Sequence, residues 1–464
     1  MVITFGYFET LQEHADQVIQ STTSKREVLM PVQGPVLLYG AGREAVSTRN
    51  FLQETSPDLT VHVCVDEGRA EIANTLQVPV SGLFEAFEKN YYATIVRSPG
   101  VSVYKPELLA AKAAKINITT NINLWAKYKC ANNKIIALTG TKGKSTTAKL
   151  LFTMLEAANF DAALAGNIGV PVLELEHHKY VVLELSSFQC ADLKLQPDFI
   201  GVTSLYPEHL DWHQTEEKYF SDKLNLLHQE NFVHQGTNFK CALSAQVLTH
   251  YALSEKEKNL DKTLPDLSSN FQAIVKNQVQ NSRLVGEHNL RNSELAARLA
   301  LGIGLSKKAI LQGIENFIPL PHRLQEFSFG NKTFVNDSIA TNPQATKAAI
   351  LAYGEKKPHI IIGGFDRDQD YEDLSKFLLE APLSHIWFLP GTGHRIANMP
   401  EGKNLQFSTK KIASLEEIFE HLRANPDQFS TLILSPGAPS YNQFKNFEQR
   451  GETFVELARK IFDN

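Results

Sequence analysis

The sequence has few cysteines, no long apolar run and no excess of positive charge. Its four cysteines, Cys64, Cys130, Cys190 and Cys241, show neither CxxC spacing nor a Cys/His ligand pattern, which excludes a disulfide framework and a zinc site. We interpret them as buried thiols. No run approaches the roughly 18 to 20 apolar residues of a membrane span. A formal net charge of −5 lacks the basic excess of a nucleic-acid-binding protein, so small-molecule chemistry is the better expectation.

The N-terminal segment also lacks the features of an export signal. It opens MVITFGYFETLQEHAD, with acidic residues where a signal peptide needs a basic region followed by a long apolar stretch. We therefore expect a cytoplasmic protein, and we expect it to be a monomer. The chain has 464 residues, enough for about three domains of roughly 150 residues each.

Apolar runs alternate with helical patterns along the chain, which predicts an α/β fold with parallel strands. The expected buried strands are residues 35–39, 61–65, 92–96, 134–139, 180–185, 199–203, 333–335, 359–362, 385–388 and 431–434. The clearest expected helices are residues 45–54, 146–158 and 217–227. The Pro-rich stretch 317–322 is predicted to be a linker, because its two closely spaced prolines break helices and favour extended chain. We place the domains at 1–130, 131–318 and 319–464.

Two loops in the first domain are candidate ligand sites. Residues 40–45 read Gly-Ala-Gly-Arg-Glu-Ala after a predicted strand, and Asp66 follows the next strand, which fits a dinucleotide-binding fingerprint. The glycines would let backbone N–H groups approach a diphosphate. NAD(P), another nucleotide and a bare tight turn all remain possible. The loop 97–100, Arg-Ser-Pro-Gly, follows a third strand at the same sheet edge and is either part of that site or an ordinary turn.

A more specific signal is the loop 140–146, Gly-Thr-Lys-Gly-Lys-Ser-Thr, between a predicted strand and a helix. It is typical of a P-loop, whose backbone cradles phosphates while Lys144 neutralises them and the Ser145 hydroxyl ligates Mg²⁺. Leu138 stands where the strict motif has its first glycine, so only the shorter GxxGK[ST] form is present. ATP binding is the favoured interpretation over a lysine-rich surface turn.

Beyond the P-loop, Glu184 is a candidate for metal chemistry, whereas His209 and Lys223 taken alone are not. Glu184 ends a buried apolar run near the P-loop, where nucleotide hydrolases usually carry a metal-coordinating acid and where a structural carboxylate would be costly. His209 follows the strand predicted at 199–203, but taken alone it is more typical of a loop histidine. Lys223, in the predicted helix 217–227, would alone be read as solvated surface.

Taken in order, these segments resemble the Mur ligase family, the ATP-dependent amide-bond ligases of peptidoglycan precursor synthesis. The resemblance runs from about residue 35 to the C-terminus. It rests on GTKGKST at 140–146, GNIG at 166–169, ELSSFQ at 184–189, PEHLDWH at 207–213, YFSDK at 219–223, GEHNLRN at 286–292, LPHR at 320–323, NDSIATN at 336–342 and SPGAPSYNQFKNFEQRG at 435–451. The last motif is typical of members that join glutamate to UDP-N-acetylmuramoyl-L-alanine.

The resemblance implies a Rossmann-like N-terminal domain that binds the UDP group, a P-loop ATPase-like central domain, and a Rossmann-like C-terminal domain that binds the incoming amino acid. It implies ATP, two Mg²⁺ ions and a carbamylated Lys223. The implied catalytic residues are Lys144, Glu184, His209 and Lys223, and the implied metal ligands are Ser145, Glu184, His209 and Lys223. The first-domain loops would then bind UDP rather than a nicotinamide cofactor.

The remaining implied contacts divide by ligand. Those to ATP are Gly140, Thr141, Lys142, Gly143, Lys144, Ser145, Thr146, Asn289, Asn292, Arg323 and Asp337. Those to the UDP-muramoyl substrate are Gly40, Gly42, Arg43, Asp66, Arg97, Ser98, Pro99, Gly100 and Asn167. Those to the amino acid are Thr341, Arg367, Ser440 and Phe447.

The identity of the added amino acid is the open point. D-glutamate is the expected substrate, but Ile339 stands where many family members carry a lysine that helps bind the glutamate carboxylate, so L-glutamate or another amino acid is the alternative. Arg367 is then expected to be the principal carboxylate anchor. Outside the family, an NAD-dependent oxidoreductase would leave the P-loop without a role. A non-catalytic ATP-responsive regulator would have no need of Lys144 and Glu184.

Overall fold

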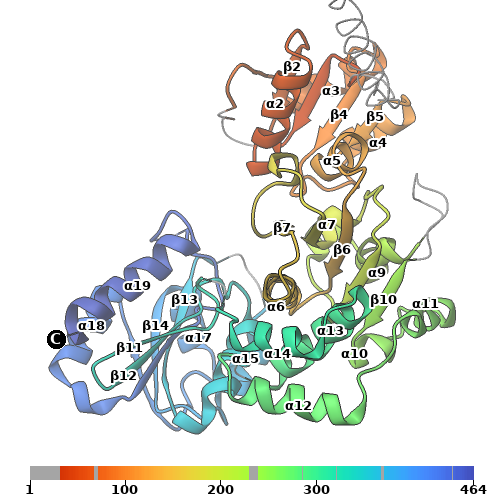
Figure 1. Cartoon of the computed structure of the whole chain (residues 1–464). Helices are drawn as coiled ribbons and strands as arrows, with labels where there is room; N and C mark the ends of the chain where they lie inside the picture. Colours follow the sequence, from red (N-terminus) through yellow and green to blue (C-terminus); the bar gives the residue numbers. More distant parts are fainter. Residues whose placement is uncertain are drawn as a thin grey trace, which may run out of the picture.

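The computed structural model describes residues 32–66, 70, 72–228, 239–284, 286–319, 321–366, 370–441 and 443–463. Arg367, the predicted carboxylate anchor, lies outside the described residues, as do Leu320 of the LPHR motif and the opening segment 1–31. Three β-sheets follow one another along the chain, each in its own lobe (Figure 1). We call these the first lobe (32–128), the second lobe (134–315) and the third lobe (325–462).

The first lobe is a five-stranded parallel sheet in the order β3-β2-β1-β4-β5. Its strands are β1 (Val36–Tyr39), β2 (Val61–Cys64), β3 (Leu76–Gln77), β4 (Thr94–Arg97) and β5 (Asn117–Thr119), and its helices are α2 (Arg43–Thr55), α3 (Leu83–Glu88), α4 (Pro106–Ala113) and α5 (Asn121–Tyr128). All four residues of β1 are fully buried, as expected for a central strand covered on both faces. The strand order reverses between β1 and β4, where a crevice opens at their carboxyl ends.

The second lobe is also a five-stranded parallel sheet, in the order β10-β9-β6-β8-β7. Its strands are β6 (Lys134–Thr139), β7 (Ala162–Gly166), β8 (Tyr180–Glu184), β9 (Phe199–Val202) and β10 (Lys240–Leu243). Its helices are α6 (Lys144–Ala157), α7 (Ser187–Cys190), α8 (Leu210–His213), α9 (Glu216–Leu224), α10 (Ala245–Leu248), α11 (Glu255–Leu260), α12 (Ser269–Gln280), α13 (Glu287–Ile303) and α14 (Lys307–Glu315). Helix α6 packs against α14 so closely that a Cβ at Gly313 would lie 2.6 Å from Met154 Cα.

The third lobe is a six-stranded sheet in the order β11-β12-β16-β13-β14-β15, parallel except for the antiparallel edge strand β11. Its strands are β11 (Gln325–Phe329), β12 (Lys332–Asn336), β13 (His359–Gly364), β14 (His385–Gly391), β15 (Ser408–Lys411) and β16 (Thr431–Leu434). Its helices are α15 (Pro343–Tyr353), α16 (Glu372–Leu378), α17 (Thr392–Asn398), α18 (Leu415–Ala424) and α19 (Phe447–Phe462). Separate apolar clusters cover its two faces.

The predicted α/β class is confirmed, and each sheet falls within one of the three predicted domains, whose exact boundaries remain a prediction. The predicted strand at 134–139 has the observed bounds of β6, while the one predicted at 92–96 is shifted to β4 (Thr94–Arg97). The helix predicted at 217–227 ends at Leu224 and continues as a 3₁₀ turn, Asn225–Leu227. All four cysteines are buried and free, as predicted. None of the helices among the described residues has the length and apolar composition needed to cross a bilayer.

Candidate functional site

The loop between β6 and α6 has the backbone of a phosphate cradle. Gly140 and Gly143 have φ values of +142° and +87°, which disfavour any side chain. A Cβ at Gly143 would lie only 2.3 Å from Asn292 Oδ1, so α13 approaches the loop directly. Because α6 begins at Lys144, its first N–H groups point toward the space over the loop, where an anion would be stabilised.

Glu184, at the end of β8, connects the P-loop with the loop after β7. Its side chain is completely buried, and both carboxylate oxygens accept hydrogen bonds. Ser145 Oγ donates to Oε2 at 3.0 Å, and Asn167 Nδ2 donates to Oε1 at 3.2 Å. Lys144 Nζ curls back to Thr141 O at 3.0 Å, and desolvation lowers the pKa of its ammonium. The structure thus brings Glu184 close to the P-loop, as expected, and adds Asn167 to the same hydrogen-bonded group.

Lys223 lies beneath the same loop rather than on the surface. Its side chain is only 2% exposed, and Nζ donates to Gly140 O at 2.8 Å. Burial, reinforced by the nearby charge of Lys144, lowers the pKa of Lys223 to about 7. A substantial fraction of this lysine is therefore a neutral amine near neutral pH, the form that can act as a nucleophile.

The segment around His209 lies between the P-loop and the third lobe. His209 has a left-handed φ of +57° at the start of α8, and its ring packs against Phe188 at 4.9 Å; burial lowers its pKa. The preceding residue, Glu208, accepts a 2.5 Å ion-paired hydrogen bond from Lys142 Nζ and a 3.4 Å bond from Asn342 Nδ2 of the third lobe. Burial alone would raise the pKa of Glu208, but the combined effect of Lys142, His209 and Lys144 lowers that pKa.

A cavity of about 310 Å³ lies at the crevice of the first lobe and continues onto the second. It is lined by Gly40 to Glu44, Ser98 to Val101, and Gly166, Asn167 and Pro171. Most of the predicted UDP-site residues therefore surround one space. Asp66 does not line this cavity; it accepts hydrogen bonds from Tyr39 Oη at 2.9 Å and Lys105 Nζ at 2.8 Å.

The Arg97 side chain does not face the cavity, which revises the expectation that it contacts a ligand. Its Nε and Nη2 donate to the two oxygens of Asp192 at 2.8 and 2.6 Å. The remaining N–H groups donate to the carbonyls of Ser98, Pro99, Val101 and Phe188. The predicted loop does line the cavity, but the sequence could not show that Asp192 of the second lobe pairs with this side chain. We therefore assign Arg97 to positioning the loop.

The third lobe contributes the loops after β12 and β16. Asp337 is buried, accepts from Ser435 Oγ at 2.7 Å and from the Leu324 N–H at 3.2 Å, and burial raises its pKa to about 7. Arg323 acts electrostatically on both Asp337 and Lys144, so it lies between this lobe and the P-loop. Its Nε is buried and has no hydrogen-bond partner among the described residues.

Hydrogen bonds link the segments of this lobe that carry Thr341, Ser440 and Phe447, three of the predicted amino-acid-binding residues. Ser338 Oγ donates to Phe447 O at 2.8 Å, and Ser440 is 2% exposed. The buried Arg450 donates from Nε to Ser338 Oγ at 3.0 Å and from Nη2 to Ala438 O at 3.0 Å. Ile339, whose side chain is half-buried, occupies the turn between Ser338 and Thr341.

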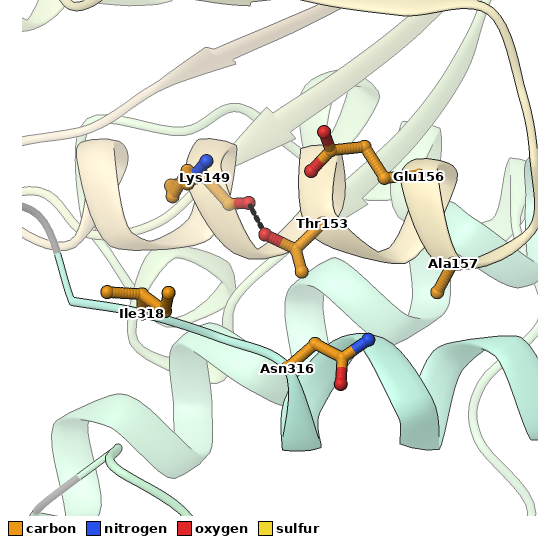
Figure 2. A pocket seen from close by; sticks show the side chains of 6 residues that line it. All are labelled: Lys149, Thr153, Glu156, Ala157, Asn316 and Ile318. Carbon is orange, nitrogen blue, oxygen red and sulfur yellow. Dashed lines mark hydrogen bonds between the residues drawn. The ribbon is translucent and has the colours of Figure 1, made fainter.

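A second cavity, of about 290 Å³, lies at the far end of α6 from the P-loop (Figure 2). Lys149, Thr153, Glu156 and Ala157 line it from α6, and Asn316 and Ile318 line it from the segment that leaves α14. None of the predicted site residues faces it. Thr153 Oγ1 donates to Lys149 O within the helix at 2.9 Å.

Several residues of the site were missed by sequence reasoning. His213, Asp222, Glu208, Asn342 and Arg450 all lie within the quoted motifs or beside them, yet their partners are distant in sequence. His213 Nδ1 lies 2.7 Å from Asp222 Oδ2, and its Nε2 lies 2.9 Å from Ser187 Oγ.

Among the residues that the structure describes, no three His, Cys, Asp or Glu side chains converge as a metal site. Asn292 Nδ2 donates to Asn289 Oδ1 at 3.2 Å, which pairs the two predicted amides of α13.

Comparison with known proteins agrees with this geometry. The Mur ligase middle domain model matches residues 138–300. The chain is 33% identical over 447 residues to a UDP-N-acetylmuramoyl-L-alanine–L-glutamate ligase from Micromonospora sp., covering 91% of this chain and 96% of that relative. It is 29% identical over 452 residues to a UDP-N-acetylmuramoylalanine–D-glutamate ligase from Bacillus thuringiensis, covering 92% and 97%. The crystal structure of UDP-N-acetylmuramate–alanine ligase from Thermotoga maritima shares the fold, with a TM-score of 0.54 at 17% identity, covering 92% of this chain and 99% of that one.

Proposed function

The chain belongs to the Mur ligase family, and on that premise we propose that it joins glutamate to the carboxylate of UDP-N-acetylmuramoyl-L-alanine with cleavage of ATP. The observation that carries the proposal is a continuous path of contacts from the first-lobe cavity to the P-loop. Asn167 lines that cavity and donates to Glu184, which in turn accepts from Ser145 of the P-loop. A carboxylate held in the cavity mouth would thus lie beside the bound γ-phosphate.

The three lobes divide the substrates. We assign the UDP group to the loops Gly40–Arg43 and Ser98–Gly100 of the first lobe, whose backbone surrounds the cavity. ATP is assigned to the P-loop, with Asn289 and Asn292 of α13 on one side and Arg323 and Asp337 of the third lobe on the other. The amino acid is assigned to the third-lobe loops that carry Thr341, Ser440 and Phe447. In the same assignment Arg367 binds the amino-acid carboxylate.

The substrate carboxylate must first be activated, because a carboxylate does not condense with an amine in water. The substrate carboxylate oxygen attacks the γ-phosphorus of ATP, which forms an acyl phosphate and releases ADP. The glutamate amine then attacks the acyl carbon, and the tetrahedral intermediate expels phosphate as the amine loses a proton. Lys144 and the N–H groups at the start of α6 stabilise the charge on the transferring phosphoryl group. Enclosure by the third lobe would keep water from the acyl phosphate.

The residues around the loop fit Mg²⁺ as the partner of ATP. Ser145 Oγ and Glu184 provide oxygen donors 3.0 Å apart, and oxygen is the ligand type that Mg²⁺ prefers. His209 and Lys223 complete the proposed set of ligands. When bound, the metal would neutralise phosphate charge. The residues themselves orient the nucleotide and keep the site dry.

Lys223 can act as a metal ligand only after its positive charge has been replaced by a negative one. As an ammonium it would repel a metal ion, whereas carbamylation by CO₂ forms an N–C bond, releases a proton and leaves an anion with two oxygens. Only the neutral amine reacts. The burial of Lys223 and its pKa of about 7 supply that form, which supports the proposal that Lys223 is carbamylated.

D-glutamate is the amino acid that the resemblance implies, and L-glutamate is a second candidate favoured by two observations. Ile339 can offer neither charge nor hydrogen bond to a carboxylate, so the pocket differs from the pattern of many family members. The L-glutamate ligase from Micromonospora sp. also shares more identity with this chain than the D-glutamate ligase from Bacillus thuringiensis, 33% against 29%.

The test is phosphate release by the purified protein with ATP, Mg²⁺ and UDP-N-acetylmuramoyl-L-alanine against a panel of D- and L-amino acids, with the product mass checked. We expect one glutamate enantiomer to support turnover at least about 100-fold above the others, a discrimination of about 2.7 kcal/mol. Turnover with neither enantiomer would overturn the proposed substrate. ATP binding without release of ADP under any of these conditions would favour a non-catalytic regulator.

A further inference from the structure

A buried hydrogen-bonded chain, Ser187–His213–Asp222, lies behind the P-loop. His213 is completely buried, Ser187 is 2% exposed and Asp222 is 9% exposed. The carboxylate of Asp222 accepts from His213 Nδ1 at 2.7 Å, which places the hydrogen on Nδ1 and leaves Nε2 to accept from Ser187 Oγ at 2.9 Å. This burial closes the three groups off from any substrate, so the chain is not a nucleophilic triad.

The position of each member in the sequence is informative. Ser187 opens α7 and lies three residues after Glu184. His213 ends α8 and lies four residues after His209. Asp222 immediately precedes Lys223 in α9. The imidazole therefore joins the three segments that carry Glu184, His209 and Lys223, the side chains that the proposed function places around the metal and nucleotide.

The imidazole has both packing contacts and hydrogen bonds. Its ring packs among Phe188, Trp212 and Tyr219, with centroid distances of 5.5, 4.4 and 5.1 Å, and a phenyl ring could make aromatic contacts of this kind but no hydrogen bonds. A buried imidazole without partners would be costly. What it adds is one rigid ring that donates at one edge and accepts at the other, which sets the spacing between α7 and α9.

Asp222 also fixes the rotation of α9. Besides His213, it accepts from Tyr104 Oη of the first lobe at 3.0 and 3.1 Å to its two oxygens. Neighbouring helix residues point about 100° apart, so Asp222 faces His213 while Lys223 faces the carbonyl of Gly140. A turn of α9 that moved Lys223 away from the P-loop would break the contacts of Asp222.

We propose that His213 is a positioning residue that holds Glu184, His209 and Lys223 in the arrangement that binds the metal–nucleotide. The inference rests on the proposed function. It predicts that loss of the imidazole weakens metal binding and turnover, while the affinity for the UDP substrate changes little, because the first-lobe cavity is lined by other residues.

The test compares His213→Phe, His213→Asn, His213→Gln and Ser187→Ala with the wild-type full-length protein. Asparagine places an amide near Nδ1 and can keep the bond to Asp222, whereas glutamine reaches toward Ser187 and loses it. Three readouts are taken: Mn²⁺ affinity from electron paramagnetic resonance with a non-hydrolysable ATP analogue, the ¹³C carbamate signal of bicarbonate-labelled protein, and kcat with KM for each substrate. His359→Phe, at another buried histidine, 4% exposed, in the third lobe, is the control for loss of an internal imidazole.

We expect His213→Phe to lower kcat at least about 100-fold and Mn²⁺ affinity about 10-fold, with KM for the UDP substrate within about 3-fold of wild type. His213→Asn should retain more activity than His213→Gln, since Asp222 and hence Lys223 stay in place. Wild-type Mn²⁺ affinity and kcat in folded His213→Phe would overturn the inference. So would losses that only follow the melting temperature and recur in His359→Phe. If His213→Phe does not fold, the same measurements are made on Ser187→Ala, which removes only the hydroxyl that contacts His213 Nε2. Wild-type Mn²⁺ affinity and kcat in that variant would then overturn the inference. A wild-type protein that ligates no amino acid would instead contradict the proposed function.

Discussion

Arg97 and Asp192 form a two-point ion pair between the first and second lobes, with Nε–Oδ2 and Nη2–Oδ1 distances of 2.8 and 2.6 Å. The Arg97 side chain is completely buried, while that of Asp192 is 23% exposed. The fork of the guanidinium also holds the carbonyls of the loop that follows β4. The pair therefore fixes the cavity loop of the first lobe to the turn that follows α7 in the second lobe.

Arg97→Met should destabilise the protein by about 2 to 4 kcal/mol. This loss is smaller than the largest found for fully buried ion pairs, because the Asp192 side chain is partly exposed to solvent. Arg97→Lys should recover little, since a single ammonium cannot replace the fork. Urea unfolding followed by tryptophan fluorescence measures the change. Arg291→Met, which breaks an exposed pair with Glu287, is the control and should cost less than about 0.5 kcal/mol. Equal losses in Arg97→Met and Arg291→Met would contradict this role.

Lys144→Ala and Glu184→Gln should each lower kcat at least about 100-fold, equivalent to roughly 2.7 kcal/mol of transition-state stabilisation. Lys144 contacts the Thr141 carbonyl of the P-loop, and Glu184 accepts a hydrogen bond from Ser145. Both side chains therefore lie at the phosphate cradle. Steady-state phosphate release provides the measurement, with circular dichroism to verify folding. Lys149→Ala, one and a half turns along the same helix and facing the second cavity, is the matched control (Figure 2). Near wild-type turnover in either site variant would remove that residue from the mechanism.

Lys223→Ala should be nearly inactive and should regain part of its activity with millimolar short carboxylic acids, which can replace the missing anion. In wild-type protein depleted of CO₂ and then given the same concentration of dissolved CO₂ at each pH, recovery should become faster as the pH rises through about 7 and then level off, because only the neutral amine reacts with CO₂. Stopped assays over time give both results. Lys218→Ala, at a half-buried lysine of the same helix, should need no rescue. A recovery rate that does not depend on pH would argue against a reactive amine at this position.

Arg367→Ala should raise the KM for glutamate roughly 10- to 200-fold, equivalent to about 1.4 to 3 kcal/mol for a charge-assisted contact, with a smaller change for ATP. The expectation follows from the absence of a cationic side chain at Ile339. Initial rates at varied glutamate concentration test it.

Ile339→Lys provides the complementary measurement for the same pocket. If an apolar residue at this turn is the reason for a preference for L-glutamate, the lysine should shift the D-to-L ratio of kcat/KM toward D-glutamate by about 10-fold or more, equivalent to about 1.4 kcal/mol. An unchanged glutamate KM in Arg367→Ala, together with an unchanged ratio in Ile339→Lys, would show that the assigned residues do not form the amino-acid pocket.

Asp337→Asn should change how stability depends on pH. The folded-state pKa of Asp337 is raised to about 7, above the ordinary value of 3.8, so the folded protein holds this proton more tightly than the unfolded chain. Its contribution to stability is complete below pH 3.8 and is lost as the pH rises toward 7, by at most about 1.4 kcal/mol per pH unit. The asparagine variant should lack this loss. Thermal unfolding of ligand-free protein from pH 4 to 8 measures it, with exposed Asp427→Asn as the control.

The sequence by itself determined the elements and motifs whose signals are local. The strand at 134–139, the glycine-rich loop and the helix that follows are neighbours along the chain, and the covalent backbone places Lys144 and Ser145 at a helix N-terminus wherever that helix lies. The parallel α/β class likewise follows from alternating apolar runs. Edge strands such as β3 and β15 were missed because their residues are exposed and carry no apolar pattern.

Only the folded chain shows which groups distant in sequence form hydrogen bonds or ion pairs or line the same cavity. Its position in the loop predicted that Arg97 binds a ligand, but its guanidinium forms an ion pair with Asp192, 95 residues away in sequence. Lys223 would pass for a solvated helix residue until packing buries it beneath Gly140 and lowers its pKa. His213 has partners at Ser187 and Asp222 that no spacing rule connects. Hydrogen bonds and desolvation act over a few ångströms in space, and only the packed chain sets those distances.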